Sequence, residues 1–181
     1  LFQVDHHIGI AAAGYIPDAR NQVDDARFFS QSNKLVYDEP VDVETVAKHL
    51  ADQAQHYTQY AGVRPFGVAL IIGGIDQQGS SLFLTDPSGT YIPYNAVAIG
   101  SNSDKVTEFL RKEYKDDITV DDAKILAIAG INQVAENTEN SNYVKMSQII
   151  NDTKHFKMLS NEEIAKIAQI SKEKYAIEPK K

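Results

Sequence analysis

The sequence predicts an α+β fold in which antiparallel sheets stack on each other and helices cover them from outside. The predicted elements alternate along the chain as strands, two helices, strands, two helices, strands and a helix. The helical segments carry apolar side chains at 3.6-residue spacing, whereas the strand segments are short and bounded by turn residues such as Asp86-Pro87-Ser88-Gly89. No internal repeat or linker interrupts the 181 residues, which predicts a single domain over 1–181.

Each element is predicted from a local pattern. We expect strands over 1–17, two helices over 18–60, strands over 66–99, two helices over 103–137, strands over 143–159 and a helix over 160–176.

Two of the helices have clear start signals. The second helix begins after Asp42, a favourable N-cap, and keeps one apolar face from Val43 to Tyr57. The last helix opens with Ser160 and has Glu163 three residues later, the pattern of a capping box.

The strand regions differ in character. Small side chains occupy alternate positions of 8–14, which lets another element approach that face closely. The segment 66–75 is almost wholly apolar, which is typical of a strand covered on both faces. We expect 95–99 to continue the sheet, with Pro93 marking an edge or a bulge. Residues 137–142 are predicted to form a loop, and 178–181 a frayed end.

Composition excludes several classes of function. The formal net charge of −7 argues against nucleic-acid binding, which needs a basic face. The chain has no cysteine, so thiolate catalysis, disulfides and cysteine zinc sites are excluded. No apolar run is long enough for a membrane helix and no leader pattern is visible, so we expect no membrane partner and a cytoplasmic location.

The residues alone indicate no active site. His6 and His7 are adjacent in a turn, so we expect their side chains to diverge; His49 and His56 are expected at the surface or at an interface. No metal site and no cofactor are predicted. No nucleotide-binding or Gly-x-Ser-x-Gly motif is present. Arg64 beside a proline predicts a fixed loop with a salt bridge.

Several segments resemble proteasome α subunits, and the resemblance runs over about residues 1–134. The segments that carry it are Gly14-Tyr15-Ile16-Pro17-Asp18-Ala19-Arg20, Tyr57-Thr58-Gln59-Tyr60-Ala61-Gly62-Val63-Arg64-Pro65-Phe66-Gly67, Gly73-Gly74-Ile75-Asp76 and Leu84-Thr85-Asp86-Pro87-Ser88-Gly89.

The resemblance implies the four-layer αββα sandwich of the N-terminal-nucleophile hydrolases. In that superfamily the attacking group belongs to the first residue of the mature chain. Leu1 has no hydroxyl or thiol, and it matches a position inside the family domain. The resemblance therefore implies a non-catalytic chain with no catalytic residue, and a chain truncated at its N-terminus.

The resemblance also implies partners and site residues. The family's α subunits form a heptameric outer ring on rings of β subunits, admit unfolded protein substrates, and dock the C-terminal tails of activator ATPases. Gly14 and Tyr15 match the wall of the activator pocket; Tyr60 and Gly62 match the turn that supports the gate. The candidates for ring contacts are Phe28, Phe29 and Arg64; because Phe28 and Phe29 are adjacent on a helix, at least one must face outward.

Two other functions remain open at this stage. One is a catalytic β-type subunit or another N-terminal-nucleophile hydrolase, which requires a nucleophilic residue at the mature N-terminus. The other is an unrelated small-molecule binding module, which requires a deep pocket with converging polar groups.

Overall fold

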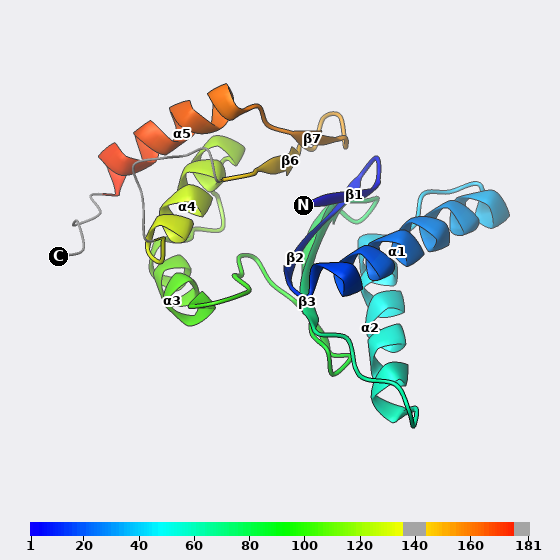
Figure 1. Cartoon of the computed structure of the whole chain (residues 1–181). Helices are drawn as coiled ribbons and strands as arrows, with labels where there is room; N and C mark the ends of the chain where they lie inside the picture. Colours follow the sequence, from blue (N-terminus) through cyan, green and yellow to red (C-terminus); the bar gives the residue numbers. More distant parts are fainter. Residues whose placement is uncertain (136–143, 176–181) are drawn as a thin grey trace. The chain divides into compact units, whose positions relative to one another are not determined.

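The computed structural model describes residues 1–135 and 144–175, and their contacts group into two compact units (Figure 1). The first unit contains residues 1–100 and 149–157, and the second contains the described residues of 101–148 and 158–181. The predicted loop over 137–142 and the predicted frayed end over 178–181 lie outside the described residues. No helix in the described part of the chain is long and apolar enough to cross a membrane.

The first unit is a five-stranded antiparallel sheet covered by two helices (Figure 1). Its strands follow one another in sheet order: β1 (Phe2–Asp5), β2 (Ile8–Gly14), β3 (Val68–Ile75), β4 (Ser80–Thr85) and β5 (Tyr91–Pro93). Helix α1 (Ile16–Tyr37) packs on β1, β2 and β3, and helix α2 (Val43–Gln59) packs on β3, β4 and β5.

The sheet buries its helix-facing side more fully than its other side. Leu70 and Ile72 of β3 are fully buried in the main apolar core, whereas Ile71 and Gly73, which alternate with them, are half-buried. The predicted covering of this strand is therefore complete on one face only. The opposite face admits a close neighbour at Gly9, where an added Cβ would lie 2.6 Å from the Phe156 ring.

Two predicted boundaries are wrong. Helix α1 begins at Ile16, not at residue 18, because Pro17 sits in the first turn, where its missing N–H forfeits no helical hydrogen bond. The sheet does not continue over 95–99. Pro93 ends β5, and the backbone N–H of Tyr94 makes one last bond to the Leu82 carbonyl oxygen.

The predicted start of α2 is correct, but the group that caps the helix is not the predicted one. Asp42 occupies the N-cap position without making a side-chain capping bond. Instead, a carboxylate oxygen of Asp76, which follows β3, accepts the backbone N–H of Val43 at 3.0 Å. The cap therefore comes from the end of a neighbouring strand and ties α2 to the sheet.

The second unit contains three helices, with α4 packed on both of the others. They are α3 (Ser103–Glu113), α4 (Val120–Asn132) and α5 (Asn161–Lys174). A small apolar core fills this unit, built from Ile128, Met146, Leu159, Ile164 and Ala168. The predicted capping box of Ser160 and Glu163 is confirmed.

A two-stranded sheet made of β6 (Ser147–Ile149) and β7 (Phe156–Met158) corresponds to the strands predicted over 143–159. Each strand has three residues, and the division between the two units passes through both. Residue 143, the first of the predicted range, lies outside the described residues.

Replacing Leu70 by alanine should destabilise the chain strongly, because Leu70 is fully buried in the main core. Large-to-small changes at such sites typically cost about 2–5 kcal/mol of unfolding free energy. The matched control is Leu35→Ala, since Leu35 is 87% exposed and its loss should change stability by less than about 0.5 kcal/mol. Urea unfolding of the three chains measures the difference, and equal midpoints would contradict this core.

Candidate functional site

Two segments far apart in sequence meet at one end of the sheet. They are the junction between β2 and α1 and the loop between α2 and β3, where the backbone N–H of Tyr15 donates to the Gly67 carbonyl at 2.8 Å. Gly14 has φ +126°, and a Cβ there would lie 2.2 Å from the Gly67 oxygen. A Cβ on Gly67 would in turn lie 2.2 Å from the Tyr15 ring. Position 14 therefore requires glycine for the two backbones to touch, and the glycine at position 67 lets the Tyr15 ring pack against that loop.

An ion pair closes this junction. Asp18, in the first turn of α1, accepts two N–H groups of the Arg64 guanidinium at 2.7 and 2.8 Å and the backbone N–H of Gly67 at 2.9 Å. The hydrogen bonds from Arg64 and then that from Gly67 outweigh the opposing effect of burial and lower the pKa of Asp18 from 3.8 to about 2. The Asp18 side chain is 9% exposed and stays ionised at neutral pH.

The Arg64 guanidinium also contacts the neighbouring ring of Tyr15. Arg64 lies over the Tyr15 ring, 5.6 Å from its centroid, a cation–π geometry. We call Gly14, Tyr15, Asp18, Arg64 and Gly67 the turn cluster.

Exposed apolar side chains lie within the turn cluster and in the connection that carries Arg64. Tyr15 is 65% exposed, Tyr60 is 66% exposed and Val63 is 48% exposed. Gly62, with φ +84° and open space around it, turns the chain between Tyr60 and Val63. An apolar surface on a fixed support is suited to contact with another polypeptide.

A second exposed apolar surface lies on the C-terminal half of α1. It consists of Phe28, Leu35, Val36 and Tyr37, which are 69–87% exposed, and we call it the α1 patch. Phe28 and Leu35 are seven residues apart and so share one face of the helix. Phe29, by contrast, packs against the main core and stacks on the His49 ring at 4.0 Å.

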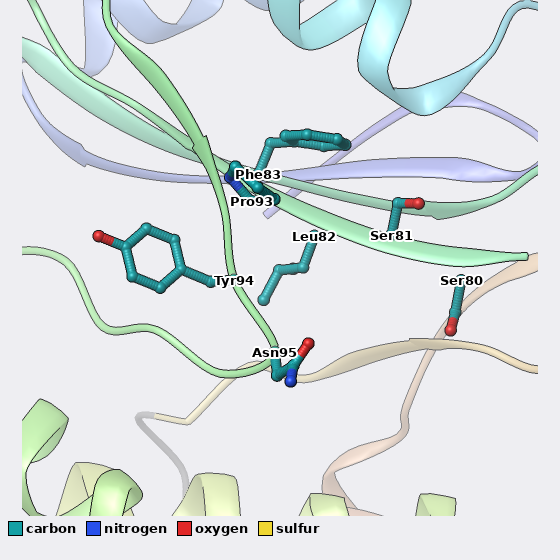
Figure 2. Close-up of a pocket in the computed structure, with 7 residues that line it drawn as sticks. All are labelled: Ser80, Ser81, Leu82, Phe83, Pro93, Tyr94 and Asn95. Atoms are coloured by element: carbon teal, nitrogen blue, oxygen red, sulfur yellow. The ribbon is translucent and has the colours of Figure 1, made fainter. Parts of the chain in front are cut away.

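The described residues of the first unit also line an open hollow of about 450 Å³ beside β4 and β5 (Figure 2). Its lining residues are Ser80, Ser81, Leu82, Phe83, Pro93, Tyr94 and Asn95. The hollow offers serine hydroxyls, but none of these lining side chains is a histidine, lysine or carboxylate that could serve as a base. The arrangement lacks the paired groups that nucleophilic catalysis requires.

The family model for proteasome subunits matches residues 1–149. The chain belongs to the proteasome subunit family. The resemblance to α subunits is also confirmed. The chain is 39% identical to proteasome subunit alpha of Methanosarcina acetivorans over 97% of its length, 42% identical to that of Archaeoglobus fulgidus over 91%, and 40% identical to that of Methanosphaerula palustris over 93%. The aligned stretch covers 71%, 66% and 70% of these relatives, so the chain spans about two thirds of their length.

The structure brings together some of the residues that the proteasome resemblance singled out. Gly14 contacts Gly67, and Tyr15 contacts both Arg64 and Gly67, while Tyr60 and Gly62 lie in the same connection as Arg64. The predicted salt bridge of Arg64 is confirmed.

The two phenylalanines of α1 lie apart from the turn cluster, along the helix. The prediction that at least one faces outward is right, because Phe28 is 74% exposed. The roles in ring contacts, gating and activator docking stay predictions.

Sequence reasoning missed Asp18 and Gly67. An acidic residue in the first turn of a helix is visible in the sequence, but its partner is 46 residues away and no local signal connects the two. Gly67 lies in one of the segments that resemble proteasome α subunits, but nothing in the sequence indicated that the Tyr15 ring would pack against it.

The histidine prediction needs a correction. His6 and His7 do not diverge: their ring centroids are 4.6 Å apart, because the tight turn between β1 and β2 aims both rings at the Asp5 carboxylate. His49 is one-third exposed and pairs with Asp25 at 2.6 Å.

Replacing Asp18 by asparagine should change how stability depends on acid. Because the pKa of Asp18 is lower in the folded chain than 3.8, its stabilising contribution is complete above about pH 3.8 and is lost as the pH falls toward about 2. Asp18→Asn should lower the melting temperature at neutral pH and flatten its decline over that acid range.

The control is Asp24→Asn, since Asp24 is 72% exposed and pairs only with Arg27 on the helix surface among the described residues. Melting temperatures measured from neutral pH to about pH 2 compare the variants. An Asp18→Asn curve parallel to that of the parent chain would contradict the role of this ion pair.

Proposed function

We propose that this chain is a non-catalytic structural and gating α subunit of a proteasome core particle. Its work is to hold neighbouring subunits and control the entry of unfolded protein substrates. The observation that carries the proposal is the turn cluster, a junction closed by the ion pair of Asp18 with Arg64 and bordered by exposed apolar side chains. Relatives at about 40% identity are named proteasome subunit alpha, which supports the same assignment.

The proposed fold is the four-layer sandwich of this family. Two helices lie on one face of the five-stranded sheet, and the half-buried opposite face, with its small residues at Gly9 and Gly73, has the character of a surface for a second sheet. The family match over 1–149 includes residues of both compact units, which supports one domain, not two.

The turn cluster is proposed to serve activator docking and gating. Gly14 and Tyr15 would form part of the pocket wall that receives C-terminal tails of activator ATPases. Tyr60 and Gly62 would support the gate from the adjoining loop. The ion pair of Asp18 with Arg64 supports this proposal because it fixes both segments before any partner arrives.

The α1 patch is proposed to contact other subunits of the particle, in the heptameric ring or in the neighbouring ring of β subunits. Phe28 and Leu35 present adjoining apolar surface on one helix face, with Val36 and Tyr37 beside them. Exposed aromatic side chains of this kind are frequent anchors of interfaces. We propose a cytoplasmic location for the assembled particle.

Mixing the chain with β subunits from a related archaeal proteasome should yield a high-mass complex in native mass spectrometry. Phe28→Ala combined with Leu35→Ala should reduce the yield of complex at least about fivefold, because truncating an interface anchor typically costs more than about 1 kcal/mol. The control is Ile92→Ala, which removes exposed apolar surface from β5, away from the α1 patch.

The same mixture separates this proposal from a catalytic subunit. An active-site-directed inhibitor that bonds covalently to the nucleophile should label only the β subunits, and the chain alone should cleave no fluorogenic peptide. A labelled α chain would favour an N-terminal-nucleophile hydrolase. A chain that stays monomeric beside competent β subunits would remove the proposal altogether.

Tyr15→Ala should weaken stimulation by an activator ATPase without affecting assembly. Loss of an exposed tyrosine at a pocket wall should raise the activator concentration needed for half-maximal protein degradation about fivefold. The control, Tyr94→Ala, removes a partly exposed tyrosine from the hollow beside β5. Equal activator responses in both variants would place the docking site elsewhere.

A further inference from the structure

The turn between β1 and β2 buries two hydrogen-bond acceptors against each other. Oδ2 of Asp5 and Nδ1 of His7 lie 3.9 Å apart, too far for a hydrogen bond. Their side chains are only 8% and 2% exposed, and neither atom has a hydrogen-bond partner among the described residues. Buried polar atoms without partners are costly, so this pair calls for an explanation.

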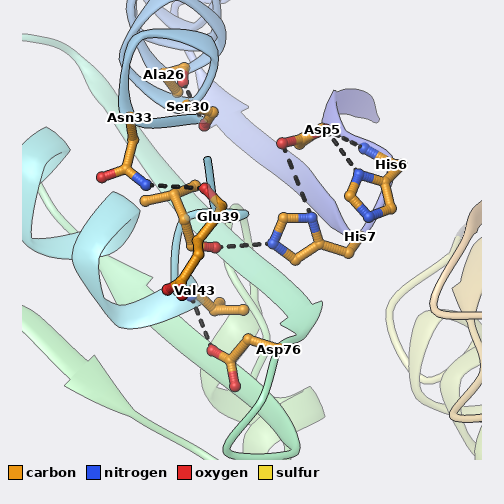
Figure 3. A network of polar contacts seen from close by, with 10 residues as sticks. Asp5, His6, His7, Ala26, Ser30, Asn33, Glu39, Val43 and Asp76 are labelled. Atoms are coloured by element: carbon orange, nitrogen blue, oxygen red, sulfur yellow. Dashed lines mark hydrogen bonds and ion pairs between the residues drawn. The ribbon is translucent and has the colours of Figure 1, made fainter. Parts of the chain in front are cut away.

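A backbone carbonyl determines which nitrogen of His7 carries the proton. Nε2 of His7 lies 2.8 Å from the carbonyl oxygen of Val41. A carbonyl oxygen can only accept, so Nε2 donates and the neutral ring leaves a lone pair on Nδ1. That lone pair faces the Asp5 carboxylate (Figure 3). A histidine held by a carbonyl through one nitrogen, with the other nitrogen free, has the arrangement of a metal ligand.

The Asp5 carboxylate remains charged beside this lone pair. Burial raises the pKa of Asp5, but the hydrogen bonds that its carboxylate accepts from the side chain and the backbone N–H of His6 oppose this effect, and the pKa lies below its ordinary value. The result is a negative oxygen and a nitrogen lone pair directed at the same small region. Such a pair is stabilised by a cation placed between them.

His6 places a third potential ligand at the adjacent position. Its Nδ1 lies 2.9 Å from Oδ1 of Asp5, and potential ligand atoms of Asp5, His6 and His7 all lie within 4.8 Å of one another (Figure 3). The His6 side chain is 39% exposed, which gives an ion a route from solvent. A further imidazole, that of His155, lies with its ring centroid 5.5 Å from that of His6.

We infer that Asp5, His6 and His7 bind one divalent transition-metal ion of the zinc class. Two imidazoles and one carboxylate form a donor set typical of Zn²⁺, whereas Mg²⁺ and Ca²⁺ prefer oxygen ligands. On binding, the ion replaces the proton between His6 and Asp5, and the neutral His6 ring carries its proton on Nε2 instead. The three ligand atoms, which lie within 4.8 Å of one another, must move closer together to share one ion.

The ion would join three segments of the first unit. His7 reaches the connection between α1 and α2 through the Val41 carbonyl, and the His6 carbonyl accepts the backbone N–H of Phe156 at 2.6 Å. Metal binding at this turn therefore stabilises the contacts among the β1–β2 turn, that connection and β7. This inference does not depend on the proposed function, because it concerns the isolated chain.

Zinc titration of the full chain, after chelator treatment, tests the site. Isothermal calorimetry and native mass spectrometry should show one Zn²⁺ per chain, and zinc should raise the melting temperature where Mg²⁺ does not. His6→Ala should weaken binding at least about tenfold, since loss of even an outer-shell partner costs that much. His6 is partly exposed, so this variant should fold normally, as circular dichroism would check.

The matched control is His56→Ala, which removes an imidazole from the last turn of α2 and should leave zinc affinity unchanged. The inference fails if the parent chain binds no zinc at about 100 µM. It also fails if His6→Ala binds as tightly as the parent, because the ion would then occupy other histidines. An ion pair between a protonated His7 and Asp5 would be the remaining explanation of the buried pair.

Discussion

The pairing of Asp18 with Arg64 is the interaction on which the arrangement of the first unit's surface depends. One carboxylate receives both N–H groups of a guanidinium and a backbone amide, and so connects the start of α1 with the loop that leads into β3. Arg64 is 64% exposed, so the net free energy of this pair is modest. Its larger effect is geometric, because Tyr15 and the loop around Gly62 are held in place by the same guanidinium.

A second constraint is the difference between the two faces of the sheet. The helix-facing side is filled by large side chains such as Leu70 and Ile72, which supply most of the apolar burial. Along β2 the other side carries glycine and alanine, and at Gly9 the aromatic ring of Phe156 lies where a Cβ would be. Small residues bury little side-chain surface themselves, but they let another element come close to the backbone. A sheet can therefore pack against a neighbour on its second face.

Local patterns predicted much of this fold, and long-range contacts explain where the prediction failed. The apolar face of α2 and the capping box at Ser160 lie within a few residues of sequence and could be recognised directly. The Asp76 cap of α2 could not, because its donor and acceptor are 33 residues apart. The rings of His6 and His7 lie close together because a tight turn directs both toward the Asp5 carboxylate. Their adjacency in sequence alone had predicted that the two side chains diverge.

The candidate site likewise has features that the sequence indicates and features that only long-range contacts explain. Gly14 and Tyr15 could be singled out by resemblance, but the reason for glycine at position 14 appears only when Gly67 is placed 2.2 Å from its absent Cβ. A site that positions polypeptide needs such fixed backbone more than it needs reactive side chains, because binding gains affinity when the partner meets a preorganised surface. The turn cluster supplies fixed backbone through two glycines and one ion pair, and it leaves the aromatic ring of Tyr15 free to contact a partner. This end of the sheet therefore offers a fixed surface with an exposed aromatic ring.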